Sequence, residues 1–511
     1  MKAFVFAAVT SLALIVVDAL KVEQRSEPAI FKLNLQKRTT GFSKSSLSER
    51  DGVASGSDVN FRKSLLYIVQ LEIGNPPQTT SVQLDTGSSD LFVQTASSSL
   101  CNAASKYHPT PCANFGSYNP NSSSTYDYID SDFKVLYGGG DGGTGDWVSD
   151  TVSFGGAVVK AAQFGILYHG DVLEGVLGVG YEQTEGRPLF SNKPQYDNFP
   201  TLLVKQGHIA SKSFSLWTND DRSASGTVIF GGIDTAKFSG NLVTIDLVPS
   251  GFADSPGVVD FTVHLNGVTG TDAGGKAVAF AGGATRSRIL LDSGSTITSL
   301  PPATAASIWA FVGAVADPKN PTFARIPCSK GNSAITINLT FDGITVAVPI
   351  SQLVIFPDST HTTCSFGIGI GSADNNIIGD TVLAAMYVVY DLDNNQVSMA
   401  PTIFNATASN ILQIMAGSGG VPDLTTRSFS SQSSTTSKSL TKTRSPMISS
   451  SHTTSSKTAS TIPSQTSSVK KTTTTNLTTL SPKVATTLQT LTRTPTITAS
   501  PTPVSPASTF K

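Results

Sequence analysis

Two short segments of this 511-residue chain place an aspartate directly before a hydroxyl residue and a glycine. They are residues 84–89, with the sequence LDTGSS, and residues 291–296, with the sequence LDSGST. Each is followed, later in its own half of the chain, by two apolar residues and a glycine, VLG at 176–178 and IIG at 377–379. A unit repeated in this way predicts two similar lobes that each supply one aspartate to a shared cleft.

The two aspartates, Asp85 and Asp292, could act together as an acid and a base. Two carboxylates held about 3 Å apart do not both ionise readily, so the pair shares one proton and its pKa values separate. The charged member can polarise a water molecule that attacks a peptide carbonyl, while the protonated member hydrogen-bonds the carbonyl oxygen. This chemistry requires neither a metal nor a cofactor. Because the pair titrates as a unit, base and acid are not assigned to single residues.

The residues around the aspartates have types that would hold the pair in place. Gly87 and Gly294 permit tight loops where a side chain would block the approach of the opposite lobe. Four hydroxyl residues can hydrogen-bond across the interface or to the carboxylates. They are Thr86 and Ser293, expected to bridge the two loops, and Ser88 and Ser295, expected to donate to the outer carboxylate oxygens.

With both aspartate motifs and both apolar-apolar-glycine segments present, residues 65–404 resemble the pepsin-like aspartic proteases. The resemblance implies a mostly β, bilobal fold in which two similar β lobes flank a central cleft. It also implies endopeptidase activity on proteins or peptides, and binding of pepstatin-like inhibitors. The segment around Tyr137 and Gly138 is similar to the β-hairpin flap that closes over substrate in this family, with Tyr137 as the flap tyrosine.

The sequence departs from the family pattern at two places. Phe92 stands where a tryptophan commonly hydrogen-bonds the flap tyrosine, and phenylalanine cannot donate that bond. Weaker flap closure is therefore expected. Residues 164–175 form a short connection, which leaves the apolar wall of the substrate pocket undefined. Asp90 and Asp141 are acidic residues near the expected cleft that could favour basic substrates.

Residues 1–19 are predicted to be a signal peptide. An apolar run over residues 3–17 leads into a small-residue pattern of the kind that signal peptidase cuts. A membrane anchor is the alternative, but the run is shorter than the roughly 20 apolar residues of a spanning helix, and no later segment qualifies. We therefore expect a secreted, extracellular or cell-wall-associated protein without a membrane span.

Residues 20–63 are predicted to be a removable pro-segment, so that the protein would be made as a zymogen. This segment carries 9 basic and 5 acidic side chains, whereas residues 64–424 carry 15 basic and 30 acidic ones. The segment could lie on the acidic body at neutral pH, with Lys32 or Lys37 near the aspartates, and be released when acid protonates carboxylates. The dibasic pair Lys37-Arg38 favours processing. A flexible arm that is never removed is the alternative.

The body is predicted to form an N-terminal β lobe over 64–240, with Asp85 and the flap, and a C-terminal β lobe over 241–404, with Asp292. Short β-branched and aromatic runs, broken by Gly, Asn, Asp and Pro, indicate mostly strands. The remainder, 405–511, is rich in Ser and Thr and predicts a disordered, extended stalk. It ends without the hydrophobic tail of a lipid-anchor signal, so no such anchor is expected.

Four cysteines and several glycosylation sequences fit an exported protein. The cysteines fall as one local pair in each half, which favours disulfides joining Cys101 to Cys112 and Cys328 to Cys364. A zinc site is the alternative, but neither pair has C-x-x-C spacing and no histidine pair lies nearby. The candidate N-glycosylation residues, each in an N-x-S/T sequence, are Asn121, Asn338, Asn405 and Asn476.

Two other interpretations of the sequence stay open. The chain could be an inactive protease-like protein that uses its cleft for binding, because a fold alone does not establish activity. It could also be a structural cell-wall protein that functions through its Ser/Thr-rich stalk.

The acidic body argues against a nucleic-acid partner, and a monomer is expected. The sequence contains no H-E-x-x-H zinc motif and no G-x-S-x-G serine motif.

Overall fold

The structure is a computed structural model. It describes residues 30–40, 64–102, 110–220, 222–223, 225–249, 257–372 and 376–422. The predicted signal peptide, much of the predicted pro-segment, and the predicted stalk from residue 423 onwards lie outside the described residues. Within the part that the structure describes, no helix combines the length and the apolar character needed to cross a membrane.

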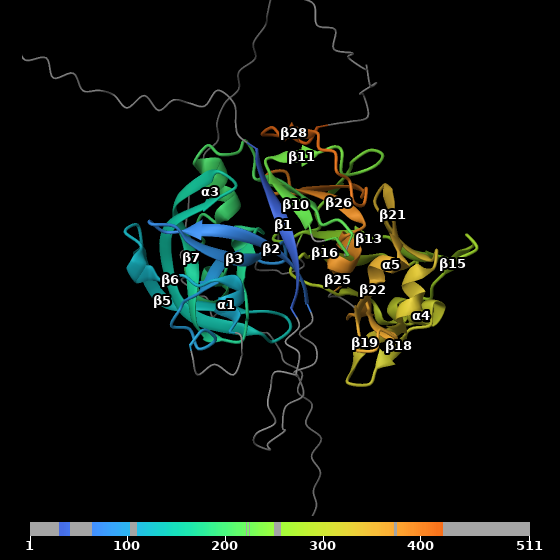
Figure 1. Cartoon of the computed structure of the whole chain (residues 1–511). Coiled ribbons are helices and arrows are strands. Elements are labelled where there is room, and N and C mark those ends of the chain that lie inside the picture. Colours follow the sequence, from blue (N-terminus) through green and yellow to red (C-terminus); the bar gives the residue numbers. More distant parts are fainter. Residues whose placement is uncertain are drawn as a thin grey trace, which may run out of the picture. The chain divides into compact units, whose positions relative to one another are not determined.

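The largest sheet in the described ranges has 13 strands and includes strands from both halves of the chain (Figure 1). In spatial order the strands are β12 (Val243–Asp246), β27 (Gln396–Pro401), β26 (Met386–Asp391), β9 (Ser213–Trp217), β10 (Ser225–Phe230), β1 (Phe31–Thr40), β2 (Ser64–Ile73), β3 (Gln78–Asp85), β8 (Gly175–Gly178), β4 (Leu91–Gln94), β7 (Ala157–Gly170), β6 (Gly142–Phe154) and β5 (Asp127–Leu136). Since β26 pairs with β9, strands from both sides of the predicted division after residue 240 share one sheet.

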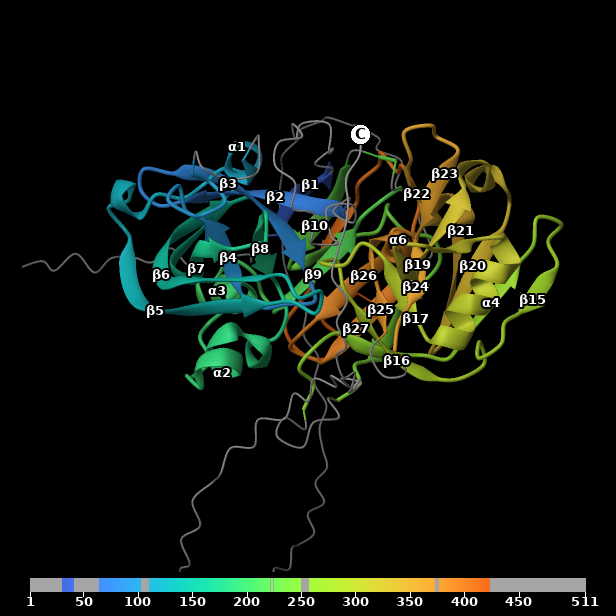
Figure 2. The same cartoon turned by 90° about the horizontal axis from the view of Figure 1, so that it is seen from below.

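Three further sheets belong to the second half of the chain. The first consists of β13 (Thr262–Leu265), β16 (Ser287–Leu291), β25 (Ile377–Ile378), β17 (Thr298–Leu300) and β24 (Ile368–Ile370). The second consists of β15 (Ala277–Ala279), β14 (Gly267–Thr271), β20 (Thr336–Phe341) and β21 (Ile344–Pro349). The third consists of β18 (Val315–Asp317), β19 (Asn320–Pro327), β23 (Thr363–Phe366) and β22 (Val354–Pro357). In Figures 1 and 2, β5, β6 and β7 lie on one side of β1, and β19 and β21 lie on the other. The mostly β, two-lobed fold predicted from the sequence is confirmed.

Helices in the described residues are short. They are α1 (Pro111–Phe115), α2 (Gly186–Ser191), α3 (Phe199–Lys205), α4 (Pro302–Val312), α5 (Ile350–Leu353) and α6 (Asp380–Leu383), with single 3₁₀ turns at η2 (Pro120–Ser122), η3 (Glu182–Thr184) and η4 (Cys328–Asn332). The longest, α4, has 11 residues and buries Ile308 and Trp309 in the second lobe. The indole N–H of Trp309 donates to the carbonyl of Ile368 in β24 at 2.8 Å, so the helix is tied to the sheet that carries Asp292.

The repeated sequence pattern folds into a repeated local topology. In the first lobe β8 pairs in parallel with β3, and in the second lobe β25 pairs in parallel with β16. The strand that follows each motif then pairs with the other edge of the same short strand, β4 with β8 and β17 with β25. Each apolar-apolar-glycine segment therefore forms a central strand next to the strand that leads into an aspartate, and the loops start from buried sheet.

Part of the predicted pro-segment is built into the large sheet. Strand β1 pairs antiparallel with β10 on one side and β2 on the other. Its alternating side chains Phe31, Leu33 and Leu35 are buried in the main core. Burial of three such side chains stabilises the fold by several kcal/mol, with each worth roughly 1.5–3 kcal/mol. Removal of this strand would therefore expose a large part of the core.

The folded body extends beyond the boundary predicted after residue 404. Strand β28 (Ile411–Gln413) pairs with β11 (Gly232–Asp234), and Ile414 is fully buried. The ammonium of Lys237 donates to the carbonyl of Ala406 at 2.6 Å. The predicted disordered stalk is thus wrong for residues 405–422, because a few apolar side chains among the Ser and Thr residues are enough to attach this stretch to the sheet.

The core position of β1 predicts a large cost for a small truncation. Leu35→Ala should lower the free energy of unfolding of the chain that retains β1 by about 2–5 kcal/mol, because a fully buried side chain leaves a cavity. The neighbouring Gln36 is exposed, so Gln36→Ala should change the same quantity by no more than about 0.5 kcal/mol. Equal effects of the two substitutions in urea denaturation would contradict the packing of β1.

Candidate active site

The first aspartate lies at the end of β3, where its carboxylate is enclosed by its own loop. Asp85 is only 5% exposed. The N–H of Gly87 donates to Asp85 Oδ1 at 2.8 Å, and the hydroxyl of Ser88 donates to Asp85 Oδ2 at 2.5 Å. Each carboxylate oxygen therefore has a donor from the loop, which holds the group in one orientation.

The second aspartate repeats this arrangement at the residue after β16. Asp292 is 8% exposed. The N–H of Gly294 donates to Asp292 Oδ1 at 2.7 Å, and the hydroxyl of Ser295 donates to Asp292 Oδ2 at 2.7 Å. The two carboxylates thus have the same donors at the same positions, as the repeated motif predicts.

Thr86 and Ser293 join the two loops by reciprocal hydrogen bonds. The Thr86 hydroxyl donates to the carbonyl of Leu291 at 2.9 Å and accepts from the N–H of Ser293 at 2.9 Å. In return, the Ser293 hydroxyl donates to the carbonyl of Leu84 at 2.9 Å and accepts from the N–H of Thr86 at 3.2 Å. Both side chains are buried, so water does not compete for these bonds.

The two carboxyl groups face each other across glycine backbones. A Cβ atom at Gly87 would lie 2.5 Å from Asp292 Oδ1, and one at Gly294 would collide with Asp85 Oδ1. Burial, the negative charge of Asp292 and a hydrogen bond to that carboxyl group raise the pKa of Asp85 well above its ordinary range. The pair can therefore hold one proton at pH values where an exposed aspartate has lost its own.

A third aspartate, Asp380, lies beneath the pair. It follows the second apolar-apolar-glycine segment and is fully buried, and neither of its carboxyl oxygens has a hydrogen-bond partner among the described residues. Burial, followed by the charge of Asp292, raises the pKa of Asp380 well above its ordinary range, while Lys37 of β1 opposes this. In the sequence, this segment stands out only as a repeat, and nothing in the motif points to a role for Asp380.

A cleft of about 460 Å³ opens onto the aspartate pair. Tyr137 and Gly138, from the turn between β5 and β6, line it together with Asp85 and Asp292. The turn is closed by hydrogen bonds from the Tyr137 N–H to the Asp141 carbonyl at 2.8 Å and from the Gly140 N–H to the Tyr137 carbonyl at 2.9 Å. The hairpin expected to be a flap therefore borders the cleft. Other lining residues include Asp141, Asp171, Val172, Leu173 and Glu174.

Phe92, the residue that replaces the expected tryptophan, lies in an apolar cluster beneath the hairpin. Its ring is 5.8 Å from that of Phe133 on β5, and Phe133 makes an edge contact with Trp147 on β6 at 4.7 Å. Tyr137 packs against this same cluster. The ring of Phe92 thus supports the hairpin by packing and supplies no hydrogen bond to it.

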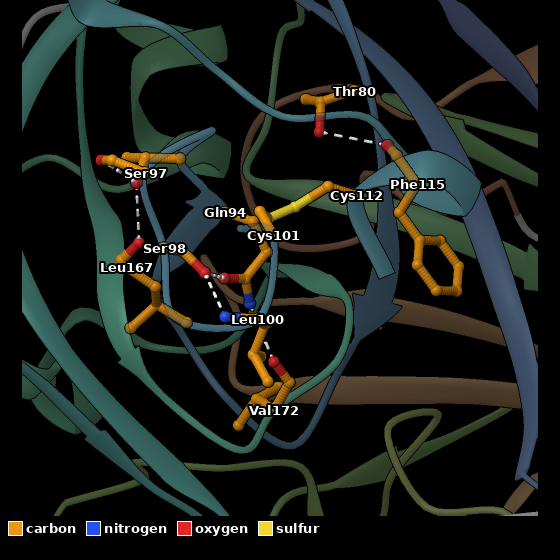
Figure 3. Close-up of a disulfide and its surroundings, with 11 residues drawn as sticks. Thr80, Gln94, Ser97, Ser98, Leu100, Cys101, Cys112, Phe115, Leu167 and Val172 are labelled. Carbon is orange, nitrogen blue, oxygen red and sulfur yellow. Dashed lines mark hydrogen bonds between the residues drawn. A yellow bond between two sulfur atoms is a disulfide. The ribbon is translucent and has the colours of Figure 1, made fainter. Parts of the chain in front are cut away.

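The first disulfide supports one wall of the cleft (Figure 3). Cys101 and Cys112 are joined, with Cα atoms 5.3 Å apart. In the adjoining loop the Ser98 hydroxyl donates to Gln94 Oε1 at 2.9 Å, and Gln94 Nε2 donates to the carbonyl of Val172 at 2.8 Å. Val172 lines the cleft, so the short connection after β7 does provide an apolar wall, held through Gln94 by the disulfide loop.

The second disulfide and the glycosylation candidates Asn121, Asn338 and Asn405 are not part of the cleft lining. Cys328 of η4 is joined to Cys364 of β23, with Cα atoms 5.0 Å apart, so both cysteine pairs form the expected bonds. Asn121, in the η2 turn, and Asn405 are exposed, whereas the amide of Asn338 donates to Thr271 Oγ1 at 2.9 Å within a sheet. Asn476 lies outside the described residues.

Asp90 does not face the cleft as the sequence analysis suggested. It is 7% exposed, and its carboxyl oxygens accept from the Tyr196 hydroxyl at 2.7 Å and from the Gly186 N–H at 2.7 Å. Beside it, the fully buried Glu185 accepts from the Tyr196 N–H at 2.9 Å. Sequence reasoning missed Glu185 and Tyr196 because both are distant from the motifs, whereas Asp141 does line the cleft.

Comparisons with known proteins show the family of this chain. The family model "Eukaryotic aspartyl protease" matches residues 66–402. The chain is 38% identical over 445 residues to the probable aspartic-type endopeptidase OPSB of Trichophyton verrucosum, covering 83% of this chain and 86% of that protein. It is 34% identical over 352 residues to secreted aspartic protease 3 of Candida albicans, covering 68% of this chain and 81% of that one.

A solved structure gives the same fold. The aspartic proteinase from Irpex lacteus superposes with a TM-score of 0.53 and 22% sequence identity, covering 68% of this chain and 96% of that chain. The fold and the paired aspartate loops define a pepsin-like aspartic protease. The chain belongs to the eukaryotic aspartyl protease family and is an aspartic endopeptidase, as the resemblance in its motifs implied.

The buried carboxyl groups predict that the protein loses stability as pH rises. Burial raises the pKa of Asp90 to about 6 and that of Glu185 to about 9. The folded state keeps protons that the unfolded chain releases, so the free energy of unfolding should fall as pH rises from about 4.5 to 7. Glu185→Gln removes one of these titrating groups, so the decrease in the free energy of unfolding between pH 4.5 and 7 should be smaller by roughly 1–3 kcal/mol.

Urea denaturation at several pH values measures this slope. Asp127 is exposed, so Asp127→Asn serves as the control and should leave the slope unchanged. A wild-type stability that is constant or increases over this pH window would contradict the assignment of these buried protons.

Proposed function

We propose that the chain is a secreted acid endopeptidase whose catalytic pair is Asp85 and Asp292, and that it is synthesised as a zymogen. One observation carries this proposal. Two buried carboxylates with identical loop donors face each other across loops that Thr86 and Ser293 lock together. Such a costly burial of two acidic groups at the base of a cleft is typical of a catalytic acid and base.

In the proposed reaction the pair carries one proton between its two carboxyl groups. The charged carboxylate accepts a proton from a water molecule, whose oxygen forms a bond to the peptide carbonyl carbon. The other carboxyl group donates its proton to the carbonyl oxygen, and a tetrahedral intermediate forms. When the C–N bond breaks, the pair donates one proton to the leaving amine nitrogen and takes one from a hydroxyl group of the intermediate, which becomes the carboxylic acid product, so the pair regains its single proton.

The hairpin around Tyr137 and Gly138 is the proposed flap. It borders the cleft together with the aspartate loops, and a glycine-rich turn follows the tyrosine. Closing this hairpin over a bound peptide would exclude water and hold the scissile bond near the pair. The Tyr137 ring, packed on the apolar cluster with Phe92 and Trp147, would supply one side of the substrate pocket.

Replacement of either aspartate tests the catalytic pair. Asp85→Asn and Asp292→Asn should each lower cleavage of a denatured protein at acid pH by about 10³-fold or more, because a single carboxyl group cannot be both acid and base. Asp127→Asn should keep full activity, and a pepstatin-like inhibitor should block the wild type. An Asp85→Asn protein that folds and still cleaves would overturn the proposal.

The position of β1 supports the zymogen part of the proposal. Lys32 forms an ion pair with the buried Asp234 at 3.7 Å, and Lys37 donates to the carbonyl oxygens of Asn219 and Asp220. The basic strand therefore lies on acidic and polar groups of the body. Release of the strand would break the ion pair between Lys32 and Asp234, and acid that neutralises carboxylates of the body would weaken its hold on a basic strand.

Processing of the purified zymogen at different pH values tests this part. Conversion to a shorter mature chain should be several-fold faster at about pH 4 than at about pH 7, because the ionic contacts of the strand weaken in acid. The Asp85→Asn zymogen should not convert at either pH if the processing is its own. Equal conversion rates at both pH values would refute acid-triggered release.

The proposed export and surface features rest on the sequence and on relatives. A related Candida albicans protein is named a secreted aspartic protease, and residues 1–19 have the features of a signal peptide. We propose that this chain is also secreted and that the Ser/Thr-rich residues from 423 onwards form a stalk, which could associate with a cell wall. Among the described glycosylation candidates, Asn121 and Asn405 are exposed.

A further inference from the structure

The residues from 185 to 196 form a bracket between the catalytic loop and the flap hairpin. Residues near both ends of the bracket contact Asp90, in the loop that follows Asp85. The Gly186 N–H and the Tyr196 hydroxyl donate to the two carboxyl oxygens of Asp90, each at 2.7 Å. Asp90 is 7% exposed, so loss of either donor leaves a buried oxygen that water does not readily reach.

The same bracket also holds β5, the first strand of the flap hairpin. Arg187 pairs with Asp130 at 3.1 Å, and Lys193 pairs with Asp130 at 2.9 Å and with Asp132 at 2.8 Å. Both aspartates lie on β5, which leads directly into Tyr137. Helix α2 of the bracket packs along this strand, so a displacement of the bracket would move the base of the flap.

The bracket contacts the second flap strand through aromatic rings. The ring of Tyr196 makes an edge contact with Trp147 of β6 at 5.4 Å, and the guanidinium of Arg187 lies 5.8 Å from the same indole ring. Trp147 is fully buried in the apolar cluster against which Tyr137 packs. Tyr196 therefore contacts the catalytic loop with its hydroxyl group and the flap with its ring.

We infer that Tyr196 and Asp90 are positioning residues that set the flap relative to the catalytic loop. Phe92 cannot donate a hydrogen bond to the flap tyrosine, whereas Tyr196 contacts both the catalytic loop and the flap. The bracket holds the flap strand through partly buried ion pairs and holds the catalytic loop through the hydrogen bond of Tyr196 to the buried Asp90, so the two segments are linked through it. This inference rests on the proposed function of the aspartate pair and adds a positioning role to it.

Tyr196→Phe tests the link by removing one hydroxyl group. The KM for a peptide long enough to lie under the flap should rise by about three- to tenfold, with kcat changed by less than about twofold, since a looser flap must be ordered on binding. Tyr128→Phe is the matched control. Tyr128 is 51% exposed at the end of β5 far from the flap turn, and its hydroxyl contacts Ser131, so its loss should leave both constants unchanged.

A second variant acts on the contacts between the bracket and β5 and changes no buried side chain. Lys193→Gln, at a side chain that is 34% exposed, removes both ion pairs to β5 and should also raise KM. If the bracket transmits position as one unit, the double variant should raise KM by less than the product of the two single effects. Distant, independent sites would give the full product.

These measurements separate the possible roles. If Tyr196→Phe lowers the melting temperature but leaves KM and kcat at wild-type values, the contact is only structural and the inference is wrong. Independent effects in the double variant, or an equal rise of KM in Tyr128→Phe, would also overturn it. A wild type without acid peptidase activity, or activity that survives Asp85→Asn, would instead contradict the proposed function.

Discussion

The reciprocal hydrogen bonds between Thr86 and Ser293 are the interaction on which the rest of the site depends. Two carboxylates are costly to bury unless their charge is shared or hydrogen-bonded. Here each loop supplies an N–H and a hydroxyl to its own aspartate, and the cross-links between the loops hold both carboxyl groups in one place. Because one loop comes from each lobe, the geometry of the aspartate pair depends on how the two lobes pack against each other.

Other carboxyl groups are also buried at a cost in free energy, and this cost depends on pH. Burial raises the pKa of Asp90, Glu185 and Asp380, so these groups are most easily accommodated when acid keeps them protonated. At higher pH each must either ionise in a poorly hydrated interior or oppose folding. Such groups would favour folding in acidic surroundings, in agreement with the proposed chemistry.

Both ends of the described body meet at one buried acid. Asp234 accepts from the Ser409 hydroxyl at 2.6 Å and from the Asn410 N–H at 2.7 Å, and it pairs with Lys32 of β1 at 3.7 Å. The N-terminal strand and the start of the C-terminal extension therefore share a contact point. Displacement of β1 during maturation would leave Asp234 to the extension alone, so the zymogen proposal concerns both chain ends.

The repeated motifs determined the family, the mostly β fold and the pair Asp85 and Asp292, because local residue types specify loops and strands wherever they occur. The cysteine spacing likewise predicted both disulfides. Only the tertiary structure decided that residues 405–422 join the body and that Asp90 is buried against Tyr196, 106 positions away. Such contacts join residues that are far apart in the chain, so they depend on how distant strands pack and cannot be predicted from any short stretch of sequence.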